Sequence, residues 1–339
     1  MNTAPTTPLL LEPLMMERVW GGNRLEAMYG KKIPPGNTIG ESWELSDRAD
    51  AQSRVAAGPF AGSTLRTLLE EHGLAIMGPR LAAAKPKWFP LLLKYVDAGS
   101  ALSVQVHPED QQAKSFNDRG KSECWVVVHA EKGALITRGL KPGTTREAYE
   151  DAVAHDRVED VLHSFQPKVG DVLALPPGMV HAIGAGIVVA EIQQNSDLTF
   201  RIYDYKRVGL DGKPRKLHIK EALSAIRFDQ PGNEFAGDML ADTVTPLKVD
   251  RDGNNTRELV LNGHYFDLWR HTITKGAFTL PACPDAPRPV MVIGGKGTIG
   301  EISVRAGNTL LLPASAPDIK IAATEPLVLL ISQPTLAAC

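Results

Sequence analysis

Polar side chains at every second position of short apolar runs constrain most strongly how this chain can fold. Within residues 102–107, Ser103, Gln105 and His107 alternate with aliphatic residues. Alternate side chains of an extended strand point to the same face, so these three polar groups share one face of a predicted β-strand. The pattern therefore predicts β-structure whose strands carry chemically active side chains.

Two further runs supply more donors. Lys121, Glu123 and Trp125 share one face of a second predicted strand by the same argument. His181 opens another strand, after a tight turn rich in glycine and proline. Two imidazoles, a carboxylate and an amide on neighbouring strands suit a divalent cation such as Zn²⁺ and leave one position open for a substrate oxygen. The candidate ligands are Gln105, His107, Glu123 and His181.

The composition narrows the class of protein. The chain has 339 residues, 43% hydrophobic and 22% charged, with a net charge of −2. This length suggests one large or two coupled domains, and the charge gives no support for nucleic-acid or membrane-surface partners. No apolar run approaches the roughly 20 residues of a membrane span, and no signal peptide is recognisable. Three widely spaced cysteines favour reduced thiols and a cytoplasmic protein.

The order of patterns along the chain predicts a mainly β protein with short helical insertions. Helical periodicity is confined to about 63–84, 144–165 and 219–228. The other segments read as short strands, in keeping with 30 glycines and 25 prolines available for turns.

An internal repeat divides the chain. The frame that runs from Gly170 through Pro176 and Gly178 to His181 returns from Gly307 to Asp318, with aspartate where the histidine stood. Such a repeat predicts two similar barrels in tandem. We expect an N-terminal catalytic barrel over 1–240, which holds the first two helical insertions, and a degenerate barrel without metal ligands over 241–339.

The frame ending at His181 resembles the second sequence motif of cupins, which are small jelly-roll β-barrels with a metal in the mouth. Over most of its length the sequence is similar to type I mannose-6-phosphate isomerases of the short bacterial form. The motifs that carry this resemblance are Trp20-Gly-Gly, Gly40–Ser46, Phe89–Lys94, Leu102–Pro108, Lys121–Trp125, Pro177–His181 and Glu191–Tyr205.

The resemblance implies a role in mannose metabolism, the interconversion of mannose 6-phosphate and fructose 6-phosphate by proton transfer through an enediol. It also implies one zinc ion per chain, held by the four candidate ligands. Arg201 matches the family's catalytic arginine, and Ser103, Lys121 and Glu191 match pocket residues around it. The planar guanidinium of Arg201 can fork onto an enediolate oxygen, although an ion pair with Asp197 or Asp204 would also explain this arginine.

Two assignments stay open at this point. The base could be Glu191, Lys121 or a hydroxide on the metal. The candidates for binding the phosphate are Lys94, Ser103 and Arg207, because an anion needs fixed donors and positive charge. Arg207 stands where some members of the family have lysine.

Three other functions are compatible with these motifs. The chain could be a non-catalytic sugar-binding or regulatory cupin, an iron-dependent cupin dioxygenase, or an isomerase for a related aldose. An intact ligand set together with Arg201 favours an enzyme acting on a small sugar phosphate. The sequence is compatible with a monomer.

Overall fold

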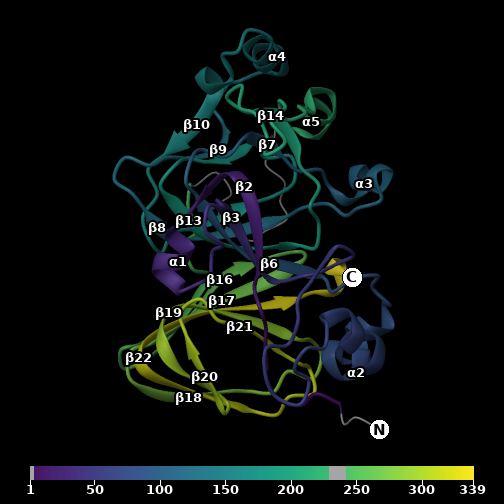
Figure 1. Cartoon of the computed structure of the whole chain (residues 1–339), viewed down its shortest axis with the longest axis vertical. Helices are drawn as coiled ribbons and strands as arrows, with labels where there is room; N and C mark the ends of the chain where they lie inside the picture. Colours follow the sequence, from purple (N-terminus) through teal and green to yellow (C-terminus); the bar gives the residue numbers. More distant parts are fainter. Residues whose placement is uncertain (1–3, 229–241) are drawn as a thin grey trace.

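The computed structural model describes residues 4–228 and 242–339. Its strands form two β-structures stacked along the long axis of the molecule, with most helices at the periphery (Figure 1). The prediction of a mainly β fold with tandem jelly-roll barrels and short helical insertions is confirmed.

The first barrel consists of two facing sheets. One has six strands in the order β11 (Val172–Leu175), β8 (Glu123–Ala130), β13 (Ile187–Gln194), β6 (Leu91–Ala98), β2 (Leu14–Gly22) and β3 (Ile39–Leu45). The other has five, in the order β10 (Leu162–Phe165), β9 (Ile136–Leu140), β12 (His181–Ile183), β7 (Val104–Val106) and β14 (Phe200–Tyr203). The strands β4 (Asp47–Arg48) and β5 (Ala51–Gln52), which follow β3 in the chain, form a separate two-stranded antiparallel sheet.

Successive side chains in the strands of the six-stranded sheet point to opposite faces. One face lines the interior of the first barrel, and the other packs against the second barrel. In β6, Val96 joins the core inside the first barrel, while Leu93 and Tyr95 join the core shared with the second barrel. Cys124 of β8 also lies in that shared core, so its role is packing.

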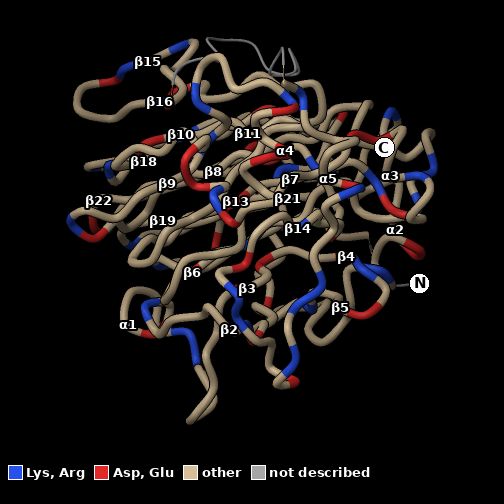
Figure 2. The backbone as a smooth tube through the Cα atoms, turned by 90° about the horizontal axis from the view of Figure 1, so that it is seen from above, with Lys and Arg blue, Asp and Glu red and all other residues tan. Residues whose placement is uncertain are grey.

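The second barrel is built from one strongly bent sheet. Its main path runs β1 (Leu9–Leu10), β21 (Thr309–Leu312), β19 (Arg288–Ile299), β22 (Ile319–Pro334), β17 (Phe266–Ile273), β16 (Asn255–Asn262) and β15 (Lys248–Asp252). The strands β18 (Gly276–Leu280) and β20 (Ile302–Arg305) pair with β22 and β19. Seen from above, β15 and β16 extend to one side, and blue and red positions are interspersed along the backbone, in keeping with the near-neutral net charge (Figure 2).

The helices are short and differ in part from the predicted ranges. They are α1 (Arg24–Tyr29), α2 (Leu65–Ala83), α3 (Asp110–Ala113), α4 (Arg146–Ala154) and α5 (Ile219–Ala225), with 3₁₀ turns at Lys114–Phe116, Val158–Val161 and Leu336–Ala338. The second predicted insertion, 144–165, is therefore helical only in part. Its last four residues form β10, because they pair with β9 at the edge of a sheet. No helix within the described residues is long and apolar enough to cross a membrane.

One strand pair of the first barrel, β11 with β8, has a counterpart in the second, β21 with β19. The leucine that ends β11, just before the Pro-x-Gly turn, pairs with Glu123, and the leucine that ends β21 pairs with Arg288. Arg288 thus stands in the second barrel where Glu123 stands in the first, and Asp318 stands in the place of His181. A guanidinium has no lone pair for a cation, so this arrangement supports the prediction that the second barrel holds no metal.

The division between the barrels is not a simple cut of the chain. The predicted boundary at 240/241 falls at the edge of 229–241, outside the described residues. N-terminal residues also take part in the second sheet, since Leu10 pairs with Leu310. The backbone of α2 accepts hydrogen bonds from Ala314 and Ser315. The boundary itself therefore stays a prediction.

Candidate active site

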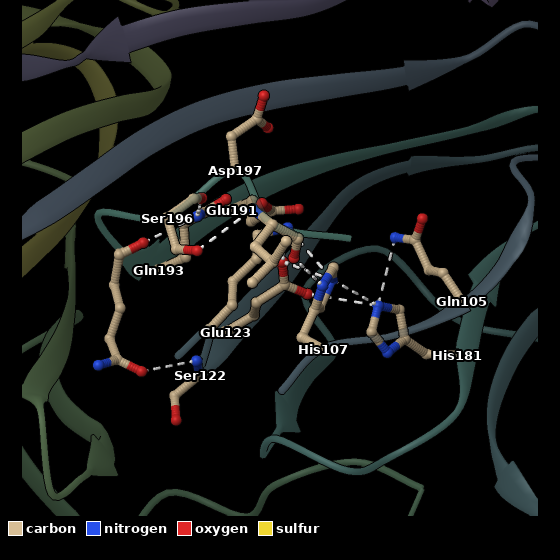
Figure 3. Close-up of polar contacts among 12 residues, drawn as sticks. Gln105, His107, Ser122, Glu123, His181, Glu191, Gln193, Ser196 and Asp197 are labelled. Atoms are coloured by element: carbon tan, nitrogen blue, oxygen red, sulfur yellow. Dashed lines mark hydrogen bonds and ion pairs between the residues drawn. The ribbon is translucent and has the colours of Figure 1, made fainter. Parts of the chain in front are cut away.

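Three of the four predicted ligands converge between the two sheets of the first barrel. His107 follows β7 and His181 opens β12 in the five-stranded sheet, whereas Glu123 opens β8 in the facing sheet. One nitrogen or oxygen of each side chain lies within 4.8 Å of the others, and all three residues are buried. Figure 3 shows the three side chains directed toward one another.

Backbone contacts orient both imidazole rings. His107 Nδ1 donates to the carbonyl of Leu198 at 2.8 Å, and His181 Nδ1 donates to the carbonyl of Met179 at 2.9 Å. With protons on Nδ1, both rings present Nε2 lone pairs to the centre, where the two Nε2 atoms lie 3.2 Å apart. Burial lowers the pKa of both histidines, which favours the neutral form that binds metals.

The carboxylate of Glu123 completes the set. Neither of its buried oxygens accepts a hydrogen bond of normal geometry, although Lys121 Nζ lies 2.5 Å from Oε1. Burial opposes the charge, but Lys121 and the two imidazoles hold the pKa of Glu123 below its usual range. Two lone pairs facing each other beside an ionised carboxylate are a donor set that fits a divalent cation.

The fourth predicted ligand, Gln105, lies at the edge of this set. It pairs in register with His181 on one side and with Arg201 on the other. Its amide Nε2 is 3.4 Å from His181 Nε2, and its Oε1 accepts from Ser103 Oγ at 3.4 Å. Exchanging the amide's oxygen and nitrogen would turn the oxygen toward the centre, and such flips are decided by the hydrogen-bond network.

A cavity of about 480 Å³ opens beside the metal-ligating groups. Lys94, Lys121, Glu191, Ser103 and Arg201, all predicted from the sequence, contribute to its lining. The sixth non-ligand site residue, Arg207, is not among the lining residues. Its guanidinium instead donates to Asp204 Oδ1 at 2.8 Å and to Ser100 Oγ at 3.2 Å.

One part of the cavity lining contains lysine and glutamate side chains that contact each other, and we call this part the floor of the cavity. Lys94 Nζ lies 3.1 Å from Glu191 Oε1, and Trp125 Nε1 donates to Glu191 Oε2 at 2.9 Å. Burial, reinforced by the charge of Glu123, raises the pKa of Glu191 to about 7. Burial would also raise the pKa of Glu41, but Lys94 and Arg18 lower it to about 2. Glu191 is therefore the carboxyl of this floor that can exchange a proton near neutral pH.

Positive charge gathers at another part of the cavity wall. Arg201 and Arg215 both line the cavity, and His218 accepts the Arg201 backbone N–H at 3.2 Å. Asp204 is buried and receives Arg215 Nε at 2.7 Å in addition to Arg207. Burial, and then the charge of Arg215, lowers the pKa of Arg201. The buried Nε of Arg201 has no hydrogen-bond partner, so this wall has donors to spare for an anion.

Sequence reasoning missed several of the lining residues: Arg18, Glu41, Arg215 and His218. The first two belong to the N-terminal strands β2 and β3, whose pattern predicts only extended structure. The other two follow β14 in a loop without periodicity. Arg215 and its partner Asp204 lie eleven residues apart in that loop, and no spacing rule in the sequence pairs them.

Comparison with known proteins places this architecture. Residues 9–122 match the family described as phosphomannose isomerase type I, catalytic domain. The chain is 33% identical over 309 residues to a mannose-6-phosphate isomerase of Streptococcus mutans, covering 90% of this chain and 92% of the relative. It is 40% identical over 226 residues to mannose-6-phosphate isomerase ManA of Bacillus subtilis, 65% of this chain and 68% of the relative. A crystal structure of the mannose 6-phosphate isomerase from Bacillus subtilis matches with a TM-score of 0.85 at 29% identity, covering 96% and 99% of the two chains.

The fold and the site define a tandem cupin with a candidate divalent-metal centre in its first barrel. The chain belongs to the type I phosphomannose isomerases, which confirms the resemblance noted in the sequence.

Proposed function

We propose that this protein interconverts mannose 6-phosphate and fructose 6-phosphate with one Zn²⁺ per chain. The observation that carries the proposal is the buried set of His107, Glu123 and His181 beside a cavity with spare guanidinium donors. The choice of substrate rests on the relatives, since the Streptococcus mutans protein is named a mannose-6-phosphate isomerase.

In this proposal the ion is held by His107, His181, Glu123 and the amide oxygen of Gln105. A bound zinc ion would polarise substrate oxygens as a Lewis acid. The protein's own part is to fix the ligands. The backbone carbonyls behind the two histidines hold the tautomers, and Lys121 beside Glu123 keeps the carboxylate ionised.

We assign the proton transfer to Glu191. The isomerisation moves a proton between two adjacent carbons, so one group must accept it and return it. The pKa of about 7 matches this task near neutral pH, and Trp125 with Lys94 fixes the carboxyl group in place. Lys121 Nζ lies 3.2 Å from His107 Nε2 and 2.5 Å from Glu123 Oε1, so its ammonium is placed to hold a substrate oxygen beside the metal-ligating groups.

Arg201 and Arg215 then bind different parts of the substrate. Arg201 is paired in register with Gln105, next to the ligands, so it can fork onto a sugar oxygen. Arg215 is oriented by Asp204 and can hold the phosphate together with His218. Of the phosphate candidates suggested by the sequence, Lys94 is engaged by Glu191 and Ser103 by Gln105, and Arg207 lies off the cavity.

Chelation tests the function directly. The purified protein should turn over mannose 6-phosphate in an assay coupled to fructose 6-phosphate consumption, lose that activity on treatment with a chelator, and recover it with Zn²⁺. Elemental analysis should give about one zinc per chain. A zinc-loaded protein that binds the sugar phosphate without turnover would favour a regulatory cupin. Oxygen uptake would favour a dioxygenase, and preference for another aldose would redefine the substrate.

Replacing Arg215 with glutamine should raise the KM for mannose 6-phosphate by roughly tenfold or more and change kcat little, because a charge-assisted hydrogen bond contributes about 1.5–3 kcal/mol. Steady-state kinetics measure both constants. The matched control is Arg251→Gln on the exposed strand β15, which should leave both unchanged. An unaltered KM for Arg215→Gln would place the phosphate elsewhere in the cavity.

Cellular location and oligomeric state stay predictions. The cysteines Cys124, Cys283 and Cys339 are free thiols, as expected of a reducing compartment. We infer a cytoplasmic protein on this ground. Size-exclusion chromatography with light scattering would test the expected monomer.

A further inference from the structure

The backbone on either side of Lys121 is held by side chains from other parts of the fold. The Gly120 N–H donates to Asp110 Oδ1 at 2.8 Å, and the Ser122 N–H donates to Gln194 Oε1 at 2.9 Å. A Cβ atom at Gly120 would lie 2.5 Å from the backbone nitrogen of Asp110, so only glycine permits this approach. The position of the Lys121 ammonium in the cavity therefore depends on where Asp110 and Gln194 lie.

Asp110 receives a second group of contacts from outside the first barrel. Gln194 Nε2 donates to Asp110 Oδ1 at 3.3 Å, so the two side chains that hold the segment also contact each other. Tyr265 Oη donates to Asp110 Oδ2 at 2.8 Å. Tyr265 lies between β16 and β17 of the second barrel and is 7% exposed, and its own carbonyl accepts from Thr335 N–H at 2.9 Å. A hydroxyl of the second barrel thus contacts Asp110, one of the two side chains that hold the backbone around Lys121.

A parallel contact lies two residues before Lys121. The guanidinium of Arg119 donates to the backbone carbonyls of Ala338 and Cys339, with 2.6 Å to the latter. Ser196 Oγ donates to the Arg119 carbonyl at 2.9 Å, one residue before Asp197 of the cavity lining. The second barrel therefore contacts the segment Asp118–Ser122 directly through Arg119, and indirectly through Tyr265 and Asp110.

We propose that Tyr265 is a positioning residue for Lys121, and that the second barrel acts in the reaction by fixing the segment that carries this lysine. The inference rests on the proposed function, because it uses Lys121 as the group that holds a substrate oxygen. A hydroxyl–carboxylate contact on buried groups is stronger than one in water, and displacement of a reacting group by about 1 Å can cost up to 100-fold in rate. The second barrel, which lacks the metal-ligating groups of the first, thereby has a catalytic consequence.

The variant Tyr265→Phe removes one oxygen and keeps the ring in its packing. We expect kcat to fall about fivefold or more, while KM, bound metal and the melting temperature stay close to wild type. The matched control is Tyr149→Phe, because Tyr149 is also buried and its hydroxyl has no hydrogen-bond partner. In an Asp110→Asn background, Tyr265→Phe should cause no further loss of kcat, since both changes break one path.

Hydrogen exchange tests the same proposal without turnover. In Tyr265→Phe, a peptide covering residues 118–122 should exchange faster than in wild type, and Tyr149→Phe should leave it unchanged. A wild-type rate of exchange in this peptide together with wild-type kcat would overturn the proposal. So would a fall in kcat that only follows a loss of metal or of thermal stability. If the wild-type protein turns over no sugar phosphate, the proposed function fails, and the exchange rate alone decides the positioning role.

Discussion

Replacing His181 with alanine is expected to remove the bound metal and to reduce turnover of mannose 6-phosphate to the background of the assay. The imidazole supplies one of two neutral nitrogen ligands, and its Nε2 lies 3.6 Å from Glu123 Oε2 and 3.2 Å from His107 Nε2. Losing it would leave three of the four candidate donors, and removing even an outer-shell partner of a ligand typically costs about 10–100-fold in affinity or activity. Elemental analysis and the coupled assay measure the two effects.

The same variant should fold, because the lost side chain lies at a strand start and packs mainly on Trp125 and His107. His155→Ala is the control, since His155 is exposed at the end of α4 and has no contact with the cavity. Near-normal turnover by a metal-free His181→Ala protein would contradict the assignment of the centre.

Replacing Arg201 with alanine is expected to leave the metal bound and to lower kcat by about 100- to 1,000-fold, the loss seen when one preorganised donor to a developing oxyanion is removed. The guanidinium is held by the Lys216 carbonyl at 3.0 Å, and its buried Nε has no hydrogen-bond partner. Steady-state kinetics on the zinc-loaded variant measure the effect.

Arg201→Lys separates charge from geometry. It keeps a cation at the wall of the cavity but loses the planar pair of donors, so we expect an intermediate rate. If Arg201→Ala instead retains wild-type kcat and loses thermal stability, the arginine serves the fold through its contact with Lys216.

The metal ligands could be predicted from sequence because strand periodicity alone places alternate side chains on one face. Glu123, however, lies in the sheet that faces His107 and His181, whereas the sequence pattern predicts all the donors on neighbouring strands, because strand periodicity does not assign a strand to a sheet. The glycines and prolines between Gly170 and His181 predict a tight turn from local backbone preferences alone, without information on which strands pack around it.

The rest of the site depends on contacts that periodicity does not describe. Arg215 lies in a loop, and its place in the cavity is set by Asp204, a partner eleven residues away. Asp110 and Tyr265 are 155 positions apart and meet only because the two barrels pack together. The strand Leu162–Phe165 was mistaken for helix because its pairing with β9, and not its own pattern, decides its structure.

The central strands of the six-stranded sheet limit which amino-acid substitutions this enzyme can accept. Every residue of β6 and β13 is buried, with the cavity on one face and the contact between barrels on the other. Lys94 of β6 is followed at once by Tyr95, and Glu191 of β13 by Ile192, so a cavity residue and a contact residue share one peptide bond. A substitution in the contact between barrels should therefore shift the cavity directly. Selection on substrate choice and selection on packing therefore act on adjacent positions of the same strands.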